Sequence, residues 1–313
     1  MKILTDLSEL TAVPGPAHLA VGFFDGVHLG HQEVIRRAQA AAAEDGGTAV
    51  VVTFDPHPMK VLRPETAPRL LTSTHHKQLI LERLGVSHLL IIPFNETLAA
   101  LSPEVFISEI RAALPSLGSI TVGRAWVFGK GRSGNLATLT ALGQANGFRV
   151  FGVAPVIVAE DPVSSTRVRL AVERGDFAAA ARLLGREYSI LGTVIQGRQL
   201  ARKLGFPTAN LALEAEQLPP IGVYAVKALV EGRQHFGVAN LGLRPTVEDG
   251  SVTRHFEVHL FDFTGDIYGA TVEVRFVQRL RDEMKMDSLD ALKAQIARDS
   301  QQARAVFEDR VPA

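Results

Sequence analysis

The first half of the chain alternates short, uninterrupted apolar runs with amphipathic stretches, and this alternation constrains the fold more than any other feature. Strands that are buried on both faces of a parallel sheet read as such continuous runs. The stretch between the first two runs has one apolar side and ends at Gly46, which is typical of an amphipathic helix. Strands that alternate with helices predict a doubly wound parallel sheet. The runs are residues 18–24, 48–54, 88–94, 119–123 and 149–158, and further helices are expected at about 74–84, 103–114 and 135–146.

The pattern changes in the second half of the chain. Residues 164–185 read as two short helices that break at Gly175, with Asp176 as the N-cap of the second. From Tyr188 onward, strands with period-2 alternation and glycine-bearing turns dominate. Five or six such strands in about 95 residues predict an antiparallel barrel, and a helix capped by Ser288 should follow it, to about residue 307. The expected fold class is α/β plus β, with an N-terminal domain over residues 1–185 and a C-terminal barrel domain over residues 186–313.

Composition narrows the classes of partner. The chain has 313 residues, a net charge of 0 and 46% hydrophobic residues, which suits two domains with real cores. A neutral chain has no broad field for nucleic acid or an anionic membrane, so neither partner is expected, and the oligomeric state is left open. The N-terminal segment MKILTDLSEL lacks a long apolar core, so no signal peptide is expected there. The absence of cysteine excludes disulfides and thiolate sites, and a cytoplasmic location is expected.

The stretch VGFFDGVHLGHQ, residues 21–32, joins the first apolar run to the first helix. His28 and His31 therefore straddle a strand-to-helix turn at the carboxyl end of a strand, where open α/β sheets bind ligands. The glycines at 22, 26 and 30 allow the backbone to approach a bulky anion, and the helix N-terminus faces the same way. Two imidazoles there can donate hydrogen bonds to phosphate oxygens. The alternative is a turn with incidental histidines, but the spacing H-x-G-H in such a turn favours function.

Three other segments carry chemistry-bearing residues. In RKLGFPTANL, residues 202–211, the oxygens of Thr208 and Asn210 are ligands of the type that Mg²⁺ accepts beside phosphates, although such a turn is more often only structural. In SSTRVR, residues 164–169, hydroxyls and arginines at a helix start suit phosphate, but an ordinary capped helix reads the same way. In FDPHP, residues 54–58, His57 stands in a rigid turn that is either ligand-binding or structural.

Gly129, Gly131 and Gly134 spell G-x-G-x-x-G, the dinucleotide-binding fingerprint. The motif follows the fourth predicted strand rather than the first, and no acidic residue stands at the end of the next strand. We therefore do not expect a dehydrogenase.

The segment GFFDGVHLGHQ resembles the signature of H-x-G-H nucleotidylyltransferases, and more narrowly that of bacterial bifunctional riboflavin kinase/FAD synthetases. Further matches follow in the order of that family and span nearly the whole chain. They are TFDPHP (53–58), SSTRVR (164–169), LGFPTANL (204–211), GVYAV (222–226), NLGLRPT (240–246), FEVHLFDF (256–263), YG (268–269) and LRDEMKMDS (280–288).

For the N-terminal domain, the resemblance implies transfer of AMP from ATP to FMN, which gives FAD and pyrophosphate. His28 and His31 would stabilise the transition state, and Ser164, Thr166 and Arg169 would grip the triphosphate. His57 and Trp126 would contact the flavin. The family usually has Asp or Asn where this chain has Ala125, so one side chain that normally contacts a nucleotide is missing. The residues expected to lie against the nucleotide are Gly22, Phe24, Asp25, Gly26 and Gly30.

For the C-terminal domain, the resemblance implies a kinase that converts riboflavin and ATP to FMN. Thr208 and Asn210 would bind Mg²⁺ and phosphate, and Glu257 would be the catalytic base. Arg281 would organise the flavin side, and Lys203 and Gly205 would contact the nucleotide. Ala201 stands where the family commonly has Gly, in a loop expected to lie over ATP.

Two alternatives remain open at this level. One is a riboflavin kinase with a weak or inactive adenylyltransferase domain, which the Ala125 departure motivates. The other is a non-catalytic flavin-binding regulator, against which the presence of His28, His31, Thr208, Asn210 and Glu257 argues.

Overall fold

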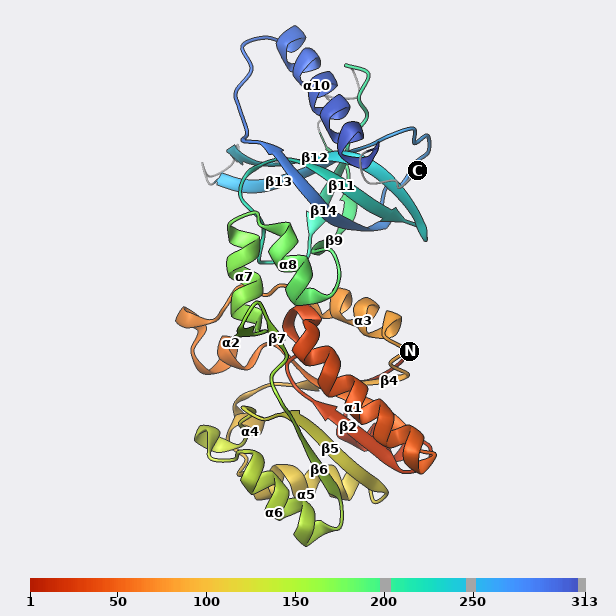
Figure 1. Cartoon of the computed structure of the whole chain (residues 1–313), viewed down its shortest axis with the longest axis vertical. Helices are drawn as coiled ribbons and strands as arrows, with labels where there is room; N and C mark the ends of the chain where they lie inside the picture. Colours follow the sequence, from red (N-terminus) through yellow and green to blue (C-terminus); the bar gives the residue numbers. More distant parts are fainter. Residues whose placement is uncertain (198–203, 246–251, 309–313) are drawn as a thin grey trace. The chain divides into compact units, whose positions relative to one another are not determined.

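The computed structural model describes residues 1–197, 204–245 and 252–308 (Figure 1). The chain divides into two compact units, which are described separately below. The first contains Met1–Arg69 and Thr74–Ser165, and the second contains Leu70–Ser73 and Thr166–Ala313.

A six-stranded sheet forms the centre of the first unit, and every neighbouring pair in it is parallel. This confirms the predicted doubly wound sheet. The three-residue edge strand β1 was not predicted, because so short a segment shows no periodicity. In spatial order the strands are β1 (Lys2–Leu4), β4 (His88–Pro93), β3 (Thr48–Asp55), β2 (Ala17–Val21), β5 (Leu117–Gly123) and β6 (Arg149–Val153).

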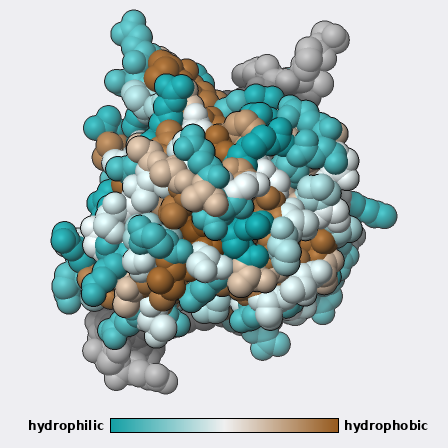
Figure 2. All heavy atoms as spheres, turned by 90° about the horizontal axis from the view of Figure 1, so that it is seen from below, coloured by the Kyte–Doolittle hydropathy of each residue, from teal (hydrophilic) through white to brown (hydrophobic). Residues whose placement is uncertain are grey.

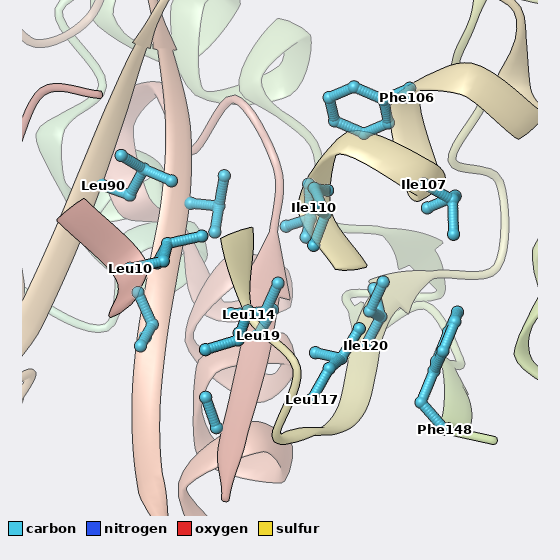
Figure 3. Close-up of a cluster of buried hydrophobic side chains, with 14 of the residues drawn as sticks. Leu10, Leu19, Leu90, Phe106, Ile107, Ile110, Leu114, Leu117, Ile120 and Phe148 are labelled. Atoms are coloured by element: carbon cyan, nitrogen blue, oxygen red, sulfur yellow. The ribbon is translucent and has the colours of Figure 1, made fainter. Parts of the chain in front are cut away.

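Helices cover both faces of this sheet, because successive side chains of a strand point to opposite faces. In β2, Leu19 and Val21 belong to one buried cluster and Ala20 to another. The first cluster also takes side chains from η1 (Leu7–Ala12), α5 (Pro103–Ala113) and α6 (Leu136–Asn146), and Figure 3 shows many of them converging. The second takes side chains from α1 (Leu29–Asp45) and α3 (Thr74–Arg83). Short helices α2 (Pro58–Leu62), η3 (Pro64–Thr66) and α4 (Glu96–Ala99) complete this part of the unit.

The apolar run at 149–158 is not one strand, as the sequence suggested. The strand β6 ends at Val153, and residues 157–162 form a separate hairpin of β7 (Ile157–Val158) and β8 (Asp161–Pro162). Pro155 stands between β6 and β7, and because proline has no N–H group it cannot donate a hydrogen bond to the sheet.

The two predicted short helices are α7 (Ser165–Glu173) and α8 (Phe177–Leu184). Gly175 separates them with a φ of 69°, and the Asp176 side chain accepts a hydrogen bond from the backbone N–H of Ala179 at 2.8 Å. The second compact unit contains all of α8 and all of α7 except its first residue, Ser165. The sequence pattern placed both helices in the first domain, so the boundary at 185/186 stays a prediction of where the two folds meet.

Six antiparallel strands close into a barrel in the second unit, which confirms the predicted architecture. The rings of Tyr224, Phe256 and Phe276 are fully buried in it, and Phe177 of α8 stacks on Phe276. The segment Leu70–Ser73 belongs here because the carbonyl of Leu70 accepts the N–H of Gln217 at 2.9 Å. The strands, in barrel order, are β10 (Ala209–Leu213), β13 (Val252–Leu260), β12 (Arg233–Pro245), β11 (Gly222–Val230), β14 (Thr271–Arg281) and β9 (Ser189–Ile195).

The terminal helix α10 (Leu289–Glu308) lies against the outer surface of the barrel beside β11 and β12 (Figure 1). Its Ala303 and Phe307 pack on Val223, Ala225 and Val238 of those strands. The Ser288 hydroxyl accepts a hydrogen bond from the N–H of Ala291 at 3.1 Å, which confirms the predicted N-cap.

Within the described ranges, no helix is both long enough and apolar enough to cross a membrane. The face shown in Figure 2 mixes hydrophilic and hydrophobic side chains, and the hydrophobic ones form small separate groups.

Candidate active sites

The first candidate site is the turn of residues 22–28, which follows β2 and leads into α1; it is called the histidine turn below. Phe24 and Val27 have positive φ angles of 54° and 42°, and Gly26 has a φ of 75° within the short helix η2 (Asp25–Val27). A positive φ is uncommon for any residue with a side chain and is a real strain for a β-branched one. A Cβ at Gly22 would come within 3.0 Å of the Phe24 ring, so glycine is needed there for close packing.

The two histidines lie at the start of α1. His28 is the N-cap, and its Nδ1 accepts a hydrogen bond from the backbone N–H of His31 at 3.3 Å. The helix therefore begins at Leu29. An imidazole whose Nδ1 accepts a hydrogen bond carries its proton at Nε2 when neutral. The two rings are stacked with centroids 3.6 Å apart, and the His31 ring meets the Phe24 ring edge-on at 5.3 Å.

The order of the strands in the sheet places this turn at a position where ligands of open α/β sheets bind. The chain proceeds from β2 to β3 and β4 on one side and then crosses to β5 on the other, so the carboxyl ends of β2 and β5 form a switch point. Open α/β sheets bind ligands at such points. The turns after β2 and β5 carry, respectively, the two histidines and Ala125 with Trp126.

The segment that contains Ser164 lies beside the histidine turn. The Ser165 hydroxyl donates a hydrogen bond to the carbonyl of Asp25 at 3.0 Å, and a Cβ at Gly30 would lie 3.9 Å from the carbonyl oxygen of Val163. Ser164 is therefore within the segment that meets the turn. Thr166 and Arg169 follow in α7 and belong to the second unit, so their grip on a triphosphate stays a prediction.

His57 follows β3 at the same edge of the sheet. It is the N-cap of α2, with Nδ1 accepting from the N–H of Met59 at 2.9 Å, and its ring lies 3.9 Å from the ring of Phe23. His57 thus has a structural role and also borders the histidine turn. Its contact with a flavin stays a prediction.

Lys77 of α3 is a functional candidate that sequence reasoning missed. Its side chain is 3% exposed, and its ammonium donates to the carbonyl of Phe23 at 2.9 Å and to the Thr53 hydroxyl at 3.3 Å. Burial lowers the pKa of Lys77 to about 8, against the favourable charges of Asp25 and Asp55. A signal was present in the sequence: Lys77 stands at the i position of an i, i+3, i+4 face whose other members are Ile80 and Leu81.

The G-x-G-x-x-G segment serves packing. Gly129 has a φ of 71°, and a Cβ there would meet the ring of Pro103 at 2.7 Å. Gly134 pairs with Phe128, whose ring would be 2.7 Å from a Cβ at Gly134. Trp126 stacks on Phe128 at 4.5 Å and packs against the sheet core. Ala125 is exposed, and the contact of Trp126 with a flavin stays a prediction.

The second candidate site lies on the barrel. Phe256 and Val258 are each 1% exposed, whereas Glu257 between them is half-buried, so its side chain points to the other face of β13. The Thr208 hydroxyl lies 3.5 Å from Glu257 Oε2, and Asn210 is directly opposite Glu257 in the pairing of β10 with β13. The structure thus brings together three residues that are up to 49 positions apart.

Asn240 was not singled out from the sequence, yet it stands opposite Glu257 on the other neighbouring strand, β12. Residues opposite each other on neighbouring strands share a face. The same row continues through Val223 on β11 to Arg281 on β14. Only the strand register, which the sequence does not state, could have revealed Asn240.

Arg281 is bound to the terminal helix. Its Nε and Nη2 donate to the two carboxylate oxygens of Asp299 at 2.8 and 2.7 Å, and Asp299 is 3% exposed. Gln295 donates to the same carboxylate at 2.8 Å. Arg281 therefore fixes α10 to the end of β14, and its role toward a flavin stays a prediction.

A cavity of about 680 Å³ opens beside Thr208. Val258 and Leu260 of β13 line it together with Phe263 and Tyr268 of the loop that follows. Gly205, just before this wall, has a φ of 91°, a conformation that favours glycine. The predicted nucleotide residue Lys203, and Ala201, lie outside the described residues.

The described residues contain no group of three or more His, Asp or Glu side chains placed to hold a metal ion. A magnesium ion bound with a nucleotide needs only one or two protein oxygens, since phosphates and waters supply the rest. The Thr208 hydroxyl and the Asn210 amide oxygen next to Glu257 fit that requirement.

Comparisons with known proteins match each half of the chain to a family of its own. A family model described as FAD synthetase matches residues 11–167, and one described as riboflavin kinase matches residues 184–307. The bifunctional riboflavin kinase/FMN adenylyltransferase of Pseudomonas fluorescens is 41% identical, over 98% of each chain. The protein of the same name from Escherichia coli K12 is 36% identical over the whole of both chains. A crystal structure described as a macrolide-efflux protein from Streptococcus pneumoniae aligns with a TM-score of 0.83 and 32% identity, over 97% of this chain and 99% of that one.

Proposed function

Because the chain belongs to the family of bifunctional riboflavin kinase/FMN adenylyltransferases, we propose that it phosphorylates riboflavin to FMN and adenylylates FMN to FAD. ATP is the co-substrate of both reactions. The observation that carries this proposal is that each half has a candidate site of its own. One is the histidine turn after β2, and the other is the group of Thr208, Asn210 and Glu257 on the barrel.

The first unit supports adenylyl transfer. An oxygen of the FMN phosphate attacks the α-phosphorus of ATP, the bond to the bridging oxygen breaks, and pyrophosphate leaves. His28, whose Nδ1 accepts within the helix N-terminus, carries its proton on Nε2 when neutral and would donate from there to a phosphate oxygen, and the stacked His31 supplies a second imidazole. Donors that are fixed before the reaction stabilise charge as it develops, and the N-terminus of α1 adds a favourable dipole.

The second unit supports phosphoryl transfer. The 5′-hydroxyl of riboflavin attacks the γ-phosphorus of ATP, Glu257 accepts the hydroxyl proton, and ADP leaves. Thr208 and Asn210 would hold Mg²⁺, which when bound neutralises charge on the triphosphate. Thr208 also lines a cavity of about 680 Å³, a volume in the range of small-molecule sites, whose other lining residues Val258 and Leu260 point to the face of β13 opposite to Glu257.

One further observation favours a second candidate. Ala125 is exposed in the turn after β5 and offers no polar atom beyond its backbone, in a place where the family resemblance implies Asp or Asn. A riboflavin kinase with a weak adenylyltransferase is therefore the alternative. The expected partners are the small molecules riboflavin, FMN and ATP, and the lack of cysteine supports a cytoplasmic location for both reactions.

Product analysis tests the proposal directly. The purified chain is incubated with riboflavin, ATP and Mg²⁺, and the flavins are separated by chromatography. FMN followed by FAD is the expected result. FMN without FAD would favour the kinase alternative, and flavin binding without consumption of ATP would favour a regulator.

A further inference from the structure

The histidine turn is held in its strained conformation by side chains from outside it. Phe24 and Val27 have positive φ angles, and such residues persist only where surrounding contacts over-determine them. Three carbonyls of the turn accept side-chain hydrogen bonds. Thr53 and Lys77 donate to Phe23, Ser165 donates to Asp25, and Gln32 donates to Val27.

Lys77 is the costliest of these donors. An ammonium that is 3% exposed has lost nearly all its water, and a buried charge is retained only with compensating partners. Its partners come from two elements besides α3: the Phe23 carbonyl on the turn and the Thr53 hydroxyl on β3. The Phe23 ring adds a cation–π contact at 4.4 Å. An apolar side chain would fill the same space between α3 and the sheet at lower cost, so packing alone does not account for a lysine here.

We propose that Lys77 is a positioning residue of the adenylyltransferase site, which locks the turn of residues 22–28 by tying the Phe23 carbonyl to α3. This rests on the proposed adenylyl transfer by the first unit. The bond fixes the residue next to Phe24, and Phe24 in turn meets the His31 ring edge-on at 5.3 Å. The ammonium therefore sets the position of the two imidazoles through the turn without contacting them.

The charge of Lys77 also opposes that of neighbouring carboxylates. Asp25 is 2% exposed in the turn, and Asp55 ends β3, and the charges of both act on the Lys77 ammonium. A cation between them lowers the negative potential that an incoming polyphosphate meets. Burial brings the pKa of Lys77 down to about 8, so the ammonium should lose its proton, and with it this effect, with a midpoint near pH 8.

The test compares Lys77→Met with Lys77→Arg in the full chain. Lys77→Met should lower kcat for FAD formation at least about 30-fold with the KM for ATP changed less than about threefold, because pre-set donors act mainly in the transition state. Lys77→Arg keeps the charge and should recover most of the loss. Formation of FMN, measured in the same preparations, should be unchanged. Lys2→Met, an exposed lysine of the same unit, is the matched control.

Hydrogen–deuterium exchange gives a readout that does not depend on activity. Backbone amides of residues 22–28 should exchange at least about tenfold faster in Lys77→Met than in the parent chain, while those of β5 should not. If the parent chain makes no FAD, the proposed function fails, yet faster exchange in the turn would still support the positioning role. Exchange and kcat within twofold of the parent would overturn the role while leaving the function intact. Should Lys77→Met not fold, the alkaline limb of the pH profile decides: its midpoint should lie near pH 8 in the parent, and the limb should be absent in Lys77→Arg.

Discussion

The two candidate sites use opposite constructions. In the first unit, the site is a single turn with backbone strain at Phe24 and Val27, and the N-terminus of a helix completes it. In the second, side chains stand in regular register on unstrained strands, with Glu257 between Asn210 and Asn240. The first arrangement depends on local fixation of one loop. The second depends on the pairing of three neighbouring strands, β10, β13 and β12, because each of them carries one member.

This difference predicts that the two activities can be separated by point substitutions. A change in the turn should leave the barrel register untouched, and a change on the outer face of β13 should not alter the turn. The aromatic residues offer a direct way to observe each unit, because the only tryptophan, Trp126, lies in the first unit and the tyrosines at 188, 224 and 268 all lie in the second.

The largest effect is expected for Glu257→Gln. The amide keeps the shape of the side chain but cannot accept the hydroxyl proton, and loss of a general base costs about 10²–10⁴-fold in rate. Formation of FMN from riboflavin should fall about 1,000-fold, whereas formation of FAD from supplied FMN should not change. Initial rates of both reactions, measured by flavin chromatography, provide the check. The exposed Glu231, changed in the same way, is the control, and equal loss in both reactions would contradict separate sites.

The reverse separation is expected for His28. His28→Ala removes both the imidazole and the N-cap, while His28→Asn retains a capping acceptor. Both should reduce FAD formation at least about 100-fold and spare FMN formation, because a transition-state donor is lost. Thermal unfolding distinguishes them, since only the alanine variant should lose the stability of the cap, about 1 kcal/mol. Normal FAD formation by His28→Asn would show that the imidazole acts as a cap only. The exposed His75→Ala serves as the control.

Arg281 tests whether the barrel site depends on its terminal helix. Arg281→Met removes the guanidinium from the buried carboxylate of Asp299, which keeps the hydrogen bond from Gln295. Removal of one member of a buried ion pair is destabilising. We expect the free energy of unfolding of the second unit to fall by about 2 kcal/mol. Unfolding of the full chain in urea, monitored by tyrosine fluorescence, measures this change. The tryptophan signal of the first unit should not shift. Replacement of both members, Arg281→Met with Asp299→Leu, should recover part of the loss, and an unchanged transition would refute the anchoring role.

The sequence predicted the first site better than the second, and the constructions explain why. The histidine turn and the start of the helix that follows it lie within the twelve consecutive residues 21–32. The glycines and both histidines are therefore visible in one stretch of sequence. The row on the barrel requires the pairing of β10, β12 and β13, and for that reason Asn240 was missed and Glu257 could be assigned only by resemblance. Lys77 was missed for another reason: a charged residue on an apolar helix face is ordinarily assigned to solvent. The boundaries of the long helices were close because their caps, Gly46 and Ser288, are local signals.

The smallest effect concerns His18, a buried histidine at the amino-terminal edge of the same sheet. The residue is 0% exposed, its Nδ1 lies 2.9 Å from the Ser119 hydroxyl, and its Nε2 lies 3.3 Å from Asp45 Oδ2. A serine, a histidine and an aspartate in line resemble a hydrolytic triad, but Ser119 is also 0% exposed, so no substrate can reach it. The group is structural. Glycines at 47 and 118 make room for the ring, since a Cβ at Gly118 would come within 2.6 Å of it.

Burial lowers the pKa of His18 in spite of the neighbouring Asp45 carboxylate, and Arg149 beside Asp45 acts in the same direction as burial. The folded chain therefore binds a proton at this position less readily than the unfolded chain, so stability should be lost as the pH falls below the unfolded value of about 6.5. Between pH 7.5 and 5.5 we expect the free energy of unfolding of the first unit to fall because of this group, measured by Trp126 fluorescence in urea. His18→Asn should be less stable at every pH but should lack this part of the pH dependence. The same acid-induced loss in both proteins would mean that other groups cause it. In that case the two units would differ in their sites alone. The described residues of the barrel include no buried histidine, so no histidine of this kind contributes to the unfolding transition that the tyrosines report.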